Sequence, residues 1–409
     1  MPAEFITVNG RDYRSPRRPT VAITIDGCAP AYLDTSLDHG LMPRLRAMLA
    51  GGGTYRLGRG YMPSFTNPNN VSIVTGASPA VHGIAGNYYR APSGEDVQLV
   101  EPSDLRAPTI YAAMRQAGMR VLAVTAKDKL RRLLADGDVP SVSAEKAHAY
   151  SLPSFGIADI SALVGRPTLD IYDPDISAYA LEIGLAVHRH GGGLDLLYVS
   201  LTDYVQHTQA PGSPAADRFY QRVDALIGAY LDAGFVVGIT ADHGMHAKQQ
   251  PDGSPRIHYL EDVLAAAGVR GFHVVLPITD SYVRHHAALG SFAWVYLPVE
   301  ERAGARRALA ALDGVEDVYS RAEAAVIYEH PIDRIGDLSV AADAHTALGA
   351  SRAKHDLALV ENNLRSHGGR HEQIVPIIVS HPLSDRYAAR YQAGARNSDL
   401  HDLLLNGLA

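Results

Sequence analysis

Three aspartates in this sequence stand directly after short runs of apolar and β-branched residues. Asp26 ends the run VAITID, Asp203 follows LLYVSLT, and Asp242 follows FVVGITA. Ligands of open parallel sheets bind outside the carboxyl ends of the strands, so acidic residues at three strand ends can share one site. A lone aspartate there is more often a turn former or a helix cap. Three together predict a binding site.

Histidines accompany these aspartates at the spacing of metal ligands. His207 lies four residues after Asp203, and at the start of a helix such a pair shares one face. His243 follows Asp242 directly, and His367 lies in the glycine-flanked loop RSHGGRHEQ. Nitrogen and oxygen ligands without sulfur suit zinc, with manganese and iron as alternatives. The pattern therefore predicts two divalent ions, and zinc is our prediction for both.

Thr66 is the candidate nucleophile. It stands in SFTNPNN, just ahead of Pro68 and a short apolar run, which predicts a loop entering a helix. A helix N-terminus offers free N–H groups to a phosphoryl oxygen, and metal coordination lowers the pKa of a hydroxyl. The alternative is that Thr66 only caps the helix. The neighbouring aspartates and histidines favour the nucleophile.

The elements that must position these residues alternate between strands and helices. Strands are predicted at VAITID (21–26), RVLAVTAK (120–127), LDLLYVSLTD (194–203), FVVGITADHG (235–244) and QIVPIIVS (373–380). Helices are predicted at residues 43–52, 108–118, 213–234 and 398–408. This alternation indicates an α/β fold with a mostly parallel sheet sandwiched by helices.

The rhythm changes between residues 247 and 365. This segment is predicted to hold two helices, two strands and short extended pieces, which we interpret as an inserted smaller α+β cap. The predicted domains are therefore a catalytic core of residues 1–246 and 366–409 and a cap of residues 247–365.

Composition narrows the classes of function. The formal net charge of −7 over 409 residues gives no basic stripe for nucleic acid. No apolar run approaches the roughly 18 residues of a membrane helix, and the N-terminal segment lacks the apolar region of a signal peptide. We therefore expect a cytoplasmic protein without nucleic-acid or membrane partners. The single cysteine, Cys28, excludes an internal disulfide framework and a cysteine-rich zinc site.

Several motifs together resemble the alkaline phosphatase superfamily, in its nucleotide pyrophosphatase/phosphodiesterase branch. They are the strand-end Asp26, the turn TNPN with SIVTG behind it, HGIAGNYY, the D-x-x-x-H of Asp203 and His207, ADHGM and the last HGG. The opening VNGRDYRSPRRPTVAITIDGCAPAYL, SFTNPNN and TAKDKL resemble the phosphonoacetate hydrolases of that branch. Each motif alone is weak, but the combination is highly specific and runs from the start of the chain to its last strand.

The resemblance implies a role for each candidate residue. One metal ion would be held by Asp203, His207 and His367, and the other by Asp26, Asp242, His243 and the nucleophile Thr66. Asn87, in HGIAGNYY, would help to bind the phosphoryl oxygens. Lys127 and Lys129, in TAKDKL, would handle the substrate carboxylate and the developing negative charge, although a lysine after a strand is usually only solvated.

The implied activity is hydrolysis of the carbon–phosphorus bond of phosphonoacetate, a small-molecule phosphonate, to acetate and phosphate through a phosphothreonine intermediate. A homodimer is plausible by analogy. One rival is a phosphodiesterase or nucleotide pyrophosphatase with the same site, for which Tyr88 and Tyr89 would supply an aromatic slot. A non-catalytic binding module is disfavoured because the nucleophile and all six other ligands are present. A mutase of the superfamily is disfavoured because its nucleophile is serine.

The other notable residues have ordinary structural explanations. Cys28 is expected to be buried, and Trp294 to lie in the core of the cap. Most of the 19 histidines must be non-ligands, and we place His246, His371 and the pair His285–His286 among them.

Overall fold

A central sheet organises most of the chain. The computed structural model describes residues 4–280, 286–358, 360 and 363–409. Seven strands form this sheet, in the order β4, β19, β10, β3, β9, β7 and β8. Their bounds are Thr54–Arg59 (β4), Ile374–Val379 (β19), Val236–Thr240 (β10), Thr20–Thr24 (β3), Leu196–Ser200 (β9), Val121–Thr125 (β7) and Ser141–Ser143 (β8).

Most neighbours in the sheet are parallel. The strands β10, β3, β9, β7 and β8 pair in parallel, while β19 runs antiparallel to both β10 and β4. Every residue of β3, β9 and β10 is buried, as expected for strands covered on both faces. The predicted fold class is confirmed. The antiparallel β19 is the last strand of the chain and lies between β4 and β10.

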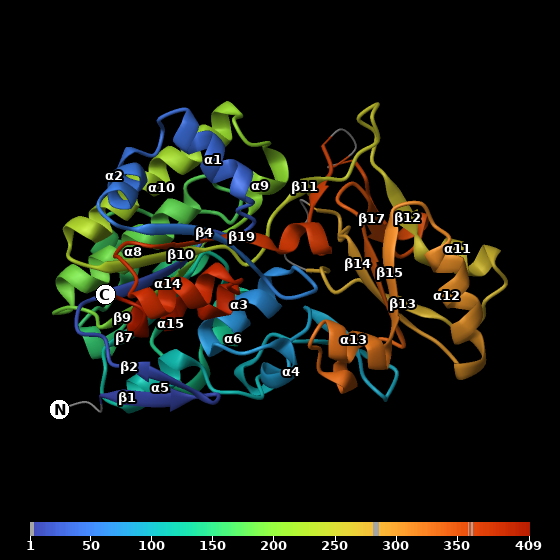
Figure 1. Ribbon diagram of the computed structural model, residues 1–409, viewed down its shortest axis with the longest axis horizontal. Helices are drawn as coiled ribbons and strands as arrows, with labels where there is room; N and C mark the ends of the chain where they lie inside the picture. The colour runs from blue at the N-terminus through green and yellow to red at the C-terminus, as the bar shows by residue number, and fades with distance from the viewer. Residues whose placement is uncertain (1–3, 281–285, 359, 361–362) are drawn as a thin grey trace.

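Helices cover both faces of the sheet (Figure 1). On one face Val21 and Ile23 of β3 pack with α1 (Pro30–Asp38), α2 (Pro43–Ala50), α8 (Ile176–His190) and α10 (Pro214–Asp232). On the other face Ala22 packs with α3 (Thr66–Thr75), α5 (Ile110–Gln116), α6 (Asp128–Leu134) and α15 (Leu400–Asn406). Successive side chains of a strand point to opposite faces, so one short strand contributes to both cores.

A second sheet lies in the segment predicted to be the cap, at the right of Figure 1. Its antiparallel strands follow the order β13 (His273–Val275), β14 (Phe292–Tyr296), β16 (Leu338–Ala342) and β15 (Val315–Ser320). The helices α11 (Leu260–Ala266), α12 (Arg302–Ala310) and α13 (Arg321–Ile327) belong to the same segment. The fully buried Trp294 lies in its core.

The two passages between core and cap run side by side. β11 (His246–Ala247) pairs antiparallel with β18 (Arg365–Ser366). The predicted domain boundaries, between residues 246 and 247 and between residues 365 and 366, fall inside this short ribbon. Met62 and Phe65, which lead into α3, pack into the apolar cluster of the cap. The helix that begins at Thr66 is therefore held between both parts.

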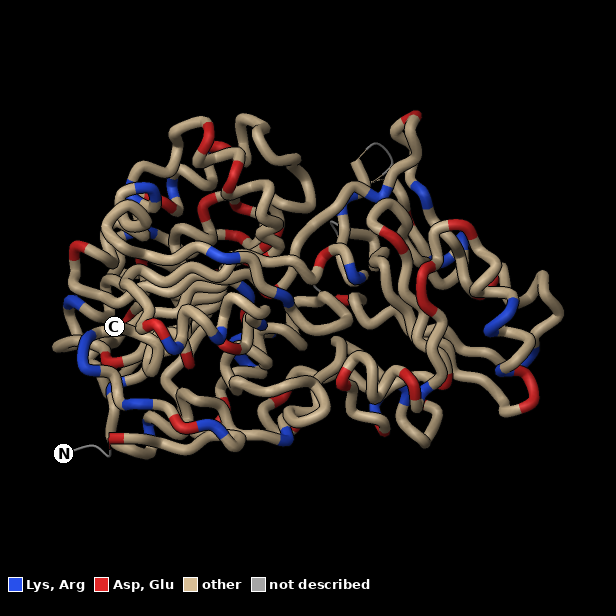
Figure 2. The backbone as a smooth tube through the Cα atoms, in the orientation of Figure 1, with Lys and Arg blue, Asp and Glu red and all other residues tan. Residues whose placement is uncertain are grey.

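Charge is distributed evenly over the molecule. Basic and acidic residues are interspersed in both parts, and Figure 2 shows no large region of one sign alone. Within the described ranges, no helix is long and apolar enough to cross a membrane.

Candidate functional site

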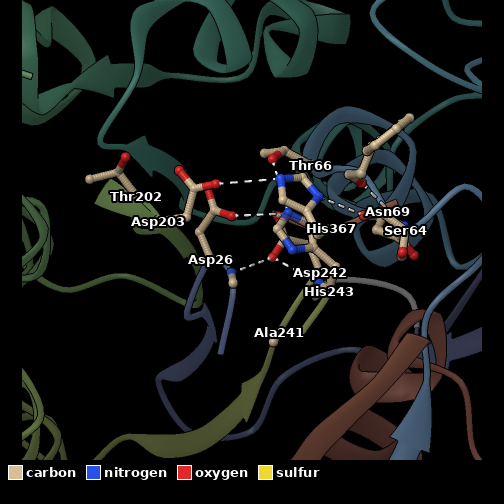
Figure 3. A network of polar contacts seen from close by, with 12 residues as sticks. Asp26, Ser64, Thr66, Asn69, Thr202, Asp203, Ala241, Asp242, His243 and His367 are labelled. Carbon is tan, nitrogen blue, oxygen red and sulfur yellow. Dashed lines mark hydrogen bonds and ion pairs between the residues drawn. The ribbon is translucent and has the colours of Figure 1, made fainter. Parts of the chain in front are cut away.

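Three neighbouring parallel strands bring the predicted acidic ligands together. The strands β10, β3 and β9 lie next to one another, and Asp242, Asp26 and Asp203 each follow one of them within three residues. All three carboxylates are almost fully buried. Figure 3 shows Asp26 and Asp203 on one side of His367 and Thr66, with Asp242 beside His243.

Each of the three histidines is oriented by a backbone carbonyl. Nδ1 lies 2.7 Å from the Arg365 carbonyl in His207, 2.8 Å from that of Gly244 in His243, and 2.8 Å from that of Ser64 in His367. A carbonyl oxygen can only accept, so Nδ1 carries the proton in all three rings. This tautomer leaves the lone pair of a neutral ring on Nε2, as in metal-binding histidines.

Those Nε2 atoms face the carboxylates. His207 Nε2 lies 3.0 Å from Asp203 Oδ2, His243 Nε2 lies 3.3 Å from Asp26 Oδ1, and His367 Nε2 lies 3.8 Å from Asp203 Oδ2. Burial lowers the pKa of His243 and moves that of His367 well below its ordinary value. A neutral Nε2 and a carboxylate oxygen are both acceptors, so the arrangement needs a proton or a cation between them.

The carboxylates show the same need for a cation. Burial, followed by the charges of Asp203 and Asp242, raises the pKa of Asp26 well above its ordinary value. Burial and then Asp203 raise the pKa of Asp242 to about 7. Asp26 Oδ1 is also buried without a hydrogen-bond donor among the described residues. These residues fit divalent cations, which would offset the negative charge and occupy the unpaired acceptors.

The ligand atoms fall into two groups, each within 4.8 Å. One contains Asp203, His207 and His367, and the other contains Asp26, Asp203 and His243. The first group is the set implied for one metal ion. In the second, Asp203 takes the place that the sequence assigned to Asp242, so Asp203 lies between the two groups. Asp242 remains adjacent, because its Oδ2 lies 3.7 Å from His243 Nε2.

Thr66 faces this cluster from the first turn of α3. The N-cap residue of the helix is Phe65, and Thr66 is its first helical residue, so Thr66 does not serve as the cap. Its Oγ1 lies 3.3 Å from His243 Nε2. Pro68 fits at this end of the helix because the N–H groups of the first turn need no helical partner.

Both predicted lysines face the same region, Lys127 from the turn after β7 and Lys129 from the first turn of α6. Lys127 Nζ lies 2.8 Å from Asp203 Oδ1 and 3.4 Å from Asp26 Oδ2. Burial acts to lower its pKa, but Asp203 and Asp26 outweigh burial and raise it. Lys129 Nζ lies 3.2 Å from Asp280 Oδ2. Its pKa is lowered by burial, which the Asp280 charge only partly offsets.

A cavity of about 30 Å³ adjoins the cluster. Its wall consists of Phe65, Thr66, Asn67, Asn87, Lys127, Lys129, Leu130, Asp203, Ile278, Asp280, His286 and His367. Asn87 is therefore near Thr66, but its Nδ2 donates to the carbonyls of Ile278, at 3.3 Å, and Thr279, at 3.2 Å. Binding a phosphoryl oxygen through Nδ2 would require an exchange of these bonds.

The segment predicted to be the cap contributes two titratable wall residues that the sequence analysis did not select as site residues. Asp280 follows FHVVLPIT, so it carried the same signal as the other acidic residues, although β13 itself ends at Val275. His286 had been placed among the non-ligands. Its Nδ1 accepts the N–H of Ala288 at 3.0 Å, and burial lowers its pKa to about 3. Its ring centroid lies 5.5 Å from that of His207.

The remaining candidates have other partners. His246 Nδ1 lies 2.8 Å from Glu372 Oε1, and His371 Nε2 lies 2.9 Å from Glu316 Oε1. Cys28 is fully buried, as expected. His285 lies outside the described residues.

Comparison with known proteins agrees with the geometry. The family model for type I phosphodiesterase / nucleotide pyrophosphatase matches residues 20–372. Phosphonoacetate hydrolase from Sinorhizobium meliloti 1021, solved in complex with phosphonoformate and with phosphonoacetate, is 43% identical over 100% of both chains, with TM-scores of 0.92 and 0.91. Murine ectonucleotide pyrophosphatase / phosphodiesterase 5 is 17% identical over 96% of both chains, with a TM-score of 0.63, and shares the fold.

These matches confirm the family that the motifs resemble. The family model spans both the core and the segment predicted to be the cap, and the sequence identity to the bacterial hydrolase extends over the full length. The chain therefore belongs to the type I phosphodiesterase / nucleotide pyrophosphatase family of the alkaline phosphatase superfamily, in which the phosphonoacetate hydrolases are its near relatives.

Proposed function

We propose that this enzyme hydrolyses the carbon–phosphorus bond of phosphonoacetate to acetate and phosphate, with Thr66 as nucleophile and two zinc ions as cofactors. The observation that carries the proposal is the composition of one small cavity. Thr66, Lys127 and Lys129 line it together, so a hydroxyl nucleophile beside a metal-ligand cluster faces two cations. Full-length identity of 43% to an enzyme solved with phosphonoacetate supports this substrate.

The donor set assigns the two metal ions. Asp203, His207 and His367 would hold one zinc ion, and Asp26, Asp242, His243 and Thr66 would hold the other. When bound, the ions stabilise negative charge on the phosphoryl oxygens and lower the pKa of hydroxyl groups.

The chemical step is a displacement at phosphorus. Thr66 gives up its hydroxyl proton to solvent water, and its Oγ1 forms a bond to phosphorus while the phosphorus–carbon bond breaks, so that the bonding electron pair leaves with the CH₂ carbon. The adjacent carboxylate delocalises this pair as an enolate, which takes a proton from water to give acetate. Water then cleaves the phosphothreonine, which releases phosphate and restores the hydroxyl group. No organic cofactor is needed.

The lysines suit the leaving group. Lys127 already lies within hydrogen-bond distance of two carboxylates, and a fixed cation stabilises the charge that develops on a carbanion or enolate. We assign Lys127 and Lys129 to the substrate carboxylate and to this developing charge. A substrate without a carboxylate would lack both the delocalisation and the contact.

The rival phosphodiesterase activity would need space for a nucleoside. The described wall of the cavity does not include Tyr88 or Tyr89, the pair that would form an aromatic slot. The phosphonate is therefore our first choice and the diester the alternative.

The test compares substrates, metal ions and the nucleophile. Metal-depleted protein should regain phosphate release from phosphonoacetate when zinc is added, and Mn²⁺ and Fe²⁺ are assayed beside it. Thr66→Ala should lower kcat by about 10³-fold or more while zinc still binds, and Thr66→Ser should retain part of the activity. Turnover of a nitrophenyl phosphodiester alone would refute the substrate, and an active Thr66→Ala enzyme would refute the nucleophile.

Two further expectations concern the cellular location and the oligomeric state. We propose a cytoplasmic location, which fractionation of the native cells tests. A homodimer is the alternative to a monomer, and light scattering of the purified protein distinguishes the two.

A further inference from the structure

Asn70 uses its whole side chain to connect the nucleophile helix with the sheet. It lies on α3, one turn after Thr66, and is fully buried. Its Nδ2 donates to the Thr66 carbonyl and to Asp242 Oδ2, both at 2.9 Å. Its Oδ1 accepts from Tyr198 Oη at 2.6 Å and from Ser200 Oγ at 2.8 Å. A side-chain amide has two N–H donors and two lone pairs, so each has a partner here.

The partners fix the orientation of the amide. The Thr66 carbonyl can only accept a hydrogen bond, and the Asp242 carboxylate accepts when ionised, so the NH₂ group must face these two. The oxygen is then left to the two hydroxyl groups, which can both donate. A flipped amide would place Oδ1 against two acceptors and lose the bonds to the Thr66 carbonyl and to Asp242.

The network joins the three strands that precede the acidic ligands. Tyr198 Oη lies 2.9 Å from Thr24 Oγ1 on β3. Because Tyr198 donates its proton to Asn70, it accepts from Thr24. Tyr198 and Ser200 belong to β9, and Asp242 follows β10. Asn70 is thus the point at which α3 meets these three strands.

Asp242 is held from both sides. Its Oδ1 accepts the N–H groups of Gly27, at 3.2 Å, and His243, at 3.0 Å, while its Oδ2 accepts from Asn70. Bonds to both oxygens fix the rotation of the carboxylate about its own bond. The Asn70 bond to the Thr66 carbonyl ties that orientation to the residue that carries the nucleophile.

We propose that Asn70 is a positioning residue that sets the Asp242 carboxylate relative to the Thr66 hydroxyl. The inference rests on the proposed function, in which Asp242 is a metal ligand and Thr66 the nucleophile. The neighbouring asparagines of SFTNPNN have different surroundings. Asn69 bonds to the backbone of Tyr61, Pro63 and Phe65, and Asn67 lines the cavity.

Asn70→Asp is the sharp variant, because it keeps the shape and replaces the NH₂ donor with a carboxylate oxygen that faces Asp242. Zinc affinity is measured by competition with a chromophoric chelator, beside kcat, KM and the melting temperature. We expect one of the two zinc ions to bind about 10- to 100-fold more weakly. With zinc in excess, kcat should fall while KM changes by less than about threefold, as for an interaction made in the transition state.

Ser72→Ala is the matched control. Ser72 lies on the same buried helix and bonds to His82 Nε2 at 2.8 Å, away from the cluster, so its loss should lower the melting temperature without changing zinc affinity or kcat. If Asn70→Asp does not fold, Asn70→Ala is measured in its place, with the same expected losses.

Wild-type zinc affinity together with a kcat within twofold of wild type, in whichever variant folds, would overturn the proposal. Zinc affinity is read without substrate, so this result is separate from a failure of the substrate assignment. A wild-type chain that bound no zinc would refute the metal centre itself before any variant was compared.

Discussion

Lys127 and Lys129 have different charged partners. Lys127 contacts the metal-ligand carboxylates, whereas Lys129 pairs with Asp280 of the cap. Methionine keeps much of either side chain's length and removes its charge. We expect either lysine-to-methionine change to lower kcat/KM for phosphonoacetate by about 10- to 100-fold, the value of one charge-assisted hydrogen bond.

A nitrophenyl phosphodiester tests whether Lys129 binds the substrate carboxylate, because this diester has no carboxylate. Turnover of this diester should fall less in Lys129→Met than turnover of phosphonoacetate does. Lys354→Met is the control, since Lys354 is 59% exposed and pairs with Glu261 on the cap. Equal losses for both substrates in Lys129→Met would contradict a carboxylate-binding role.

The three aspartates that the sequence predicts share one property: each lies where chain direction alone implies its position. Asp26, Asp203 and Asp242 follow buried strands, so parallel pairing brings them together. Asn70 gives no such signal, because it looks like any polar residue in a short helix, and its partners on β9 are known only once α3 is packed on the sheet. Asp280 had the signal, but it belongs to the segment interpreted as a cap.

At the scale of elements, the stability of α3 depends on the residue at its C-cap. Its C-cap, Gly76, has φ of +64°, in the left-handed region that favours glycine. A Cβ there would lie 2.0 Å from Tyr13 Oη on β2 (Arg11–Arg14). We expect Gly76→Ala to reduce the free energy of unfolding by about 2–4 kcal/mol, from backbone strain and overpacking together.

A second variant, Gly118→Ala, separates the cost of backbone strain from the cost of overpacking. Gly118 also has positive φ, +87°, but a Cβ there would meet nothing within 4 Å. Its substitution should cost only the backbone strain of about 1–2 kcal/mol. Urea unfolding of both variants checks this, and equal losses would show that contact with Tyr13 contributes nothing.

The sequence predicts strands most clearly where they are buried on both faces of the sheet. The strands β3, β9 and β10 are buried on both faces and read as continuous apolar runs. The hairpin of β1 (Phe5–Val8) and β2, the hairpin of β5 (Tyr88–Arg90) and β6 (Asp96–Gln98), and β4 are partly exposed. Their mixed composition gives no clear periodicity, and the antiparallel direction of β19 depends on the path through the cap.

At the scale of the whole molecule, a buried ion pair connects the core with the cap. Glu372 accepts from Lys248 Nζ at 2.8 Å and from the N–H of Gly369 at 2.9 Å, and its carbonyl accepts the N–H of Gly244. Burial acts to raise the pKa of Glu372, but Lys248 and His246 together outweigh it and the pKa falls to about 2. The loops that carry His243 and His367 are thus fixed to each other at the junction.

Metal removal should therefore weaken the whole fold in a pH-dependent way. The folded pKa of Asp242 is raised to about 7, from an ordinary value of about 4, so the folded state binds this proton more tightly than the unfolded chain. Its contribution to stability is present below about pH 4 and is lost as the pH rises through 7. Asp26, whose pKa is also raised well above its ordinary value by burial, acts in the same direction.

Histidines with lowered pKa act in the opposite direction, but above about pH 7 they are neutral in both states. Between about pH 6.5 and 7.5, as Asp242 loses its proton in the folded state, the free energy of unfolding of the chelator-treated protein should fall, by at most about 1.4 kcal/mol per pH unit for each carboxyl group. The zinc-loaded protein should show no such fall, because the ions stabilise the ionised carboxylates. Asp242→Asn should flatten the profile of the metal-free protein, since it removes one titrating group. Parallel profiles with and without zinc would show that the buried carboxylates are neutralised by something other than the metal ions.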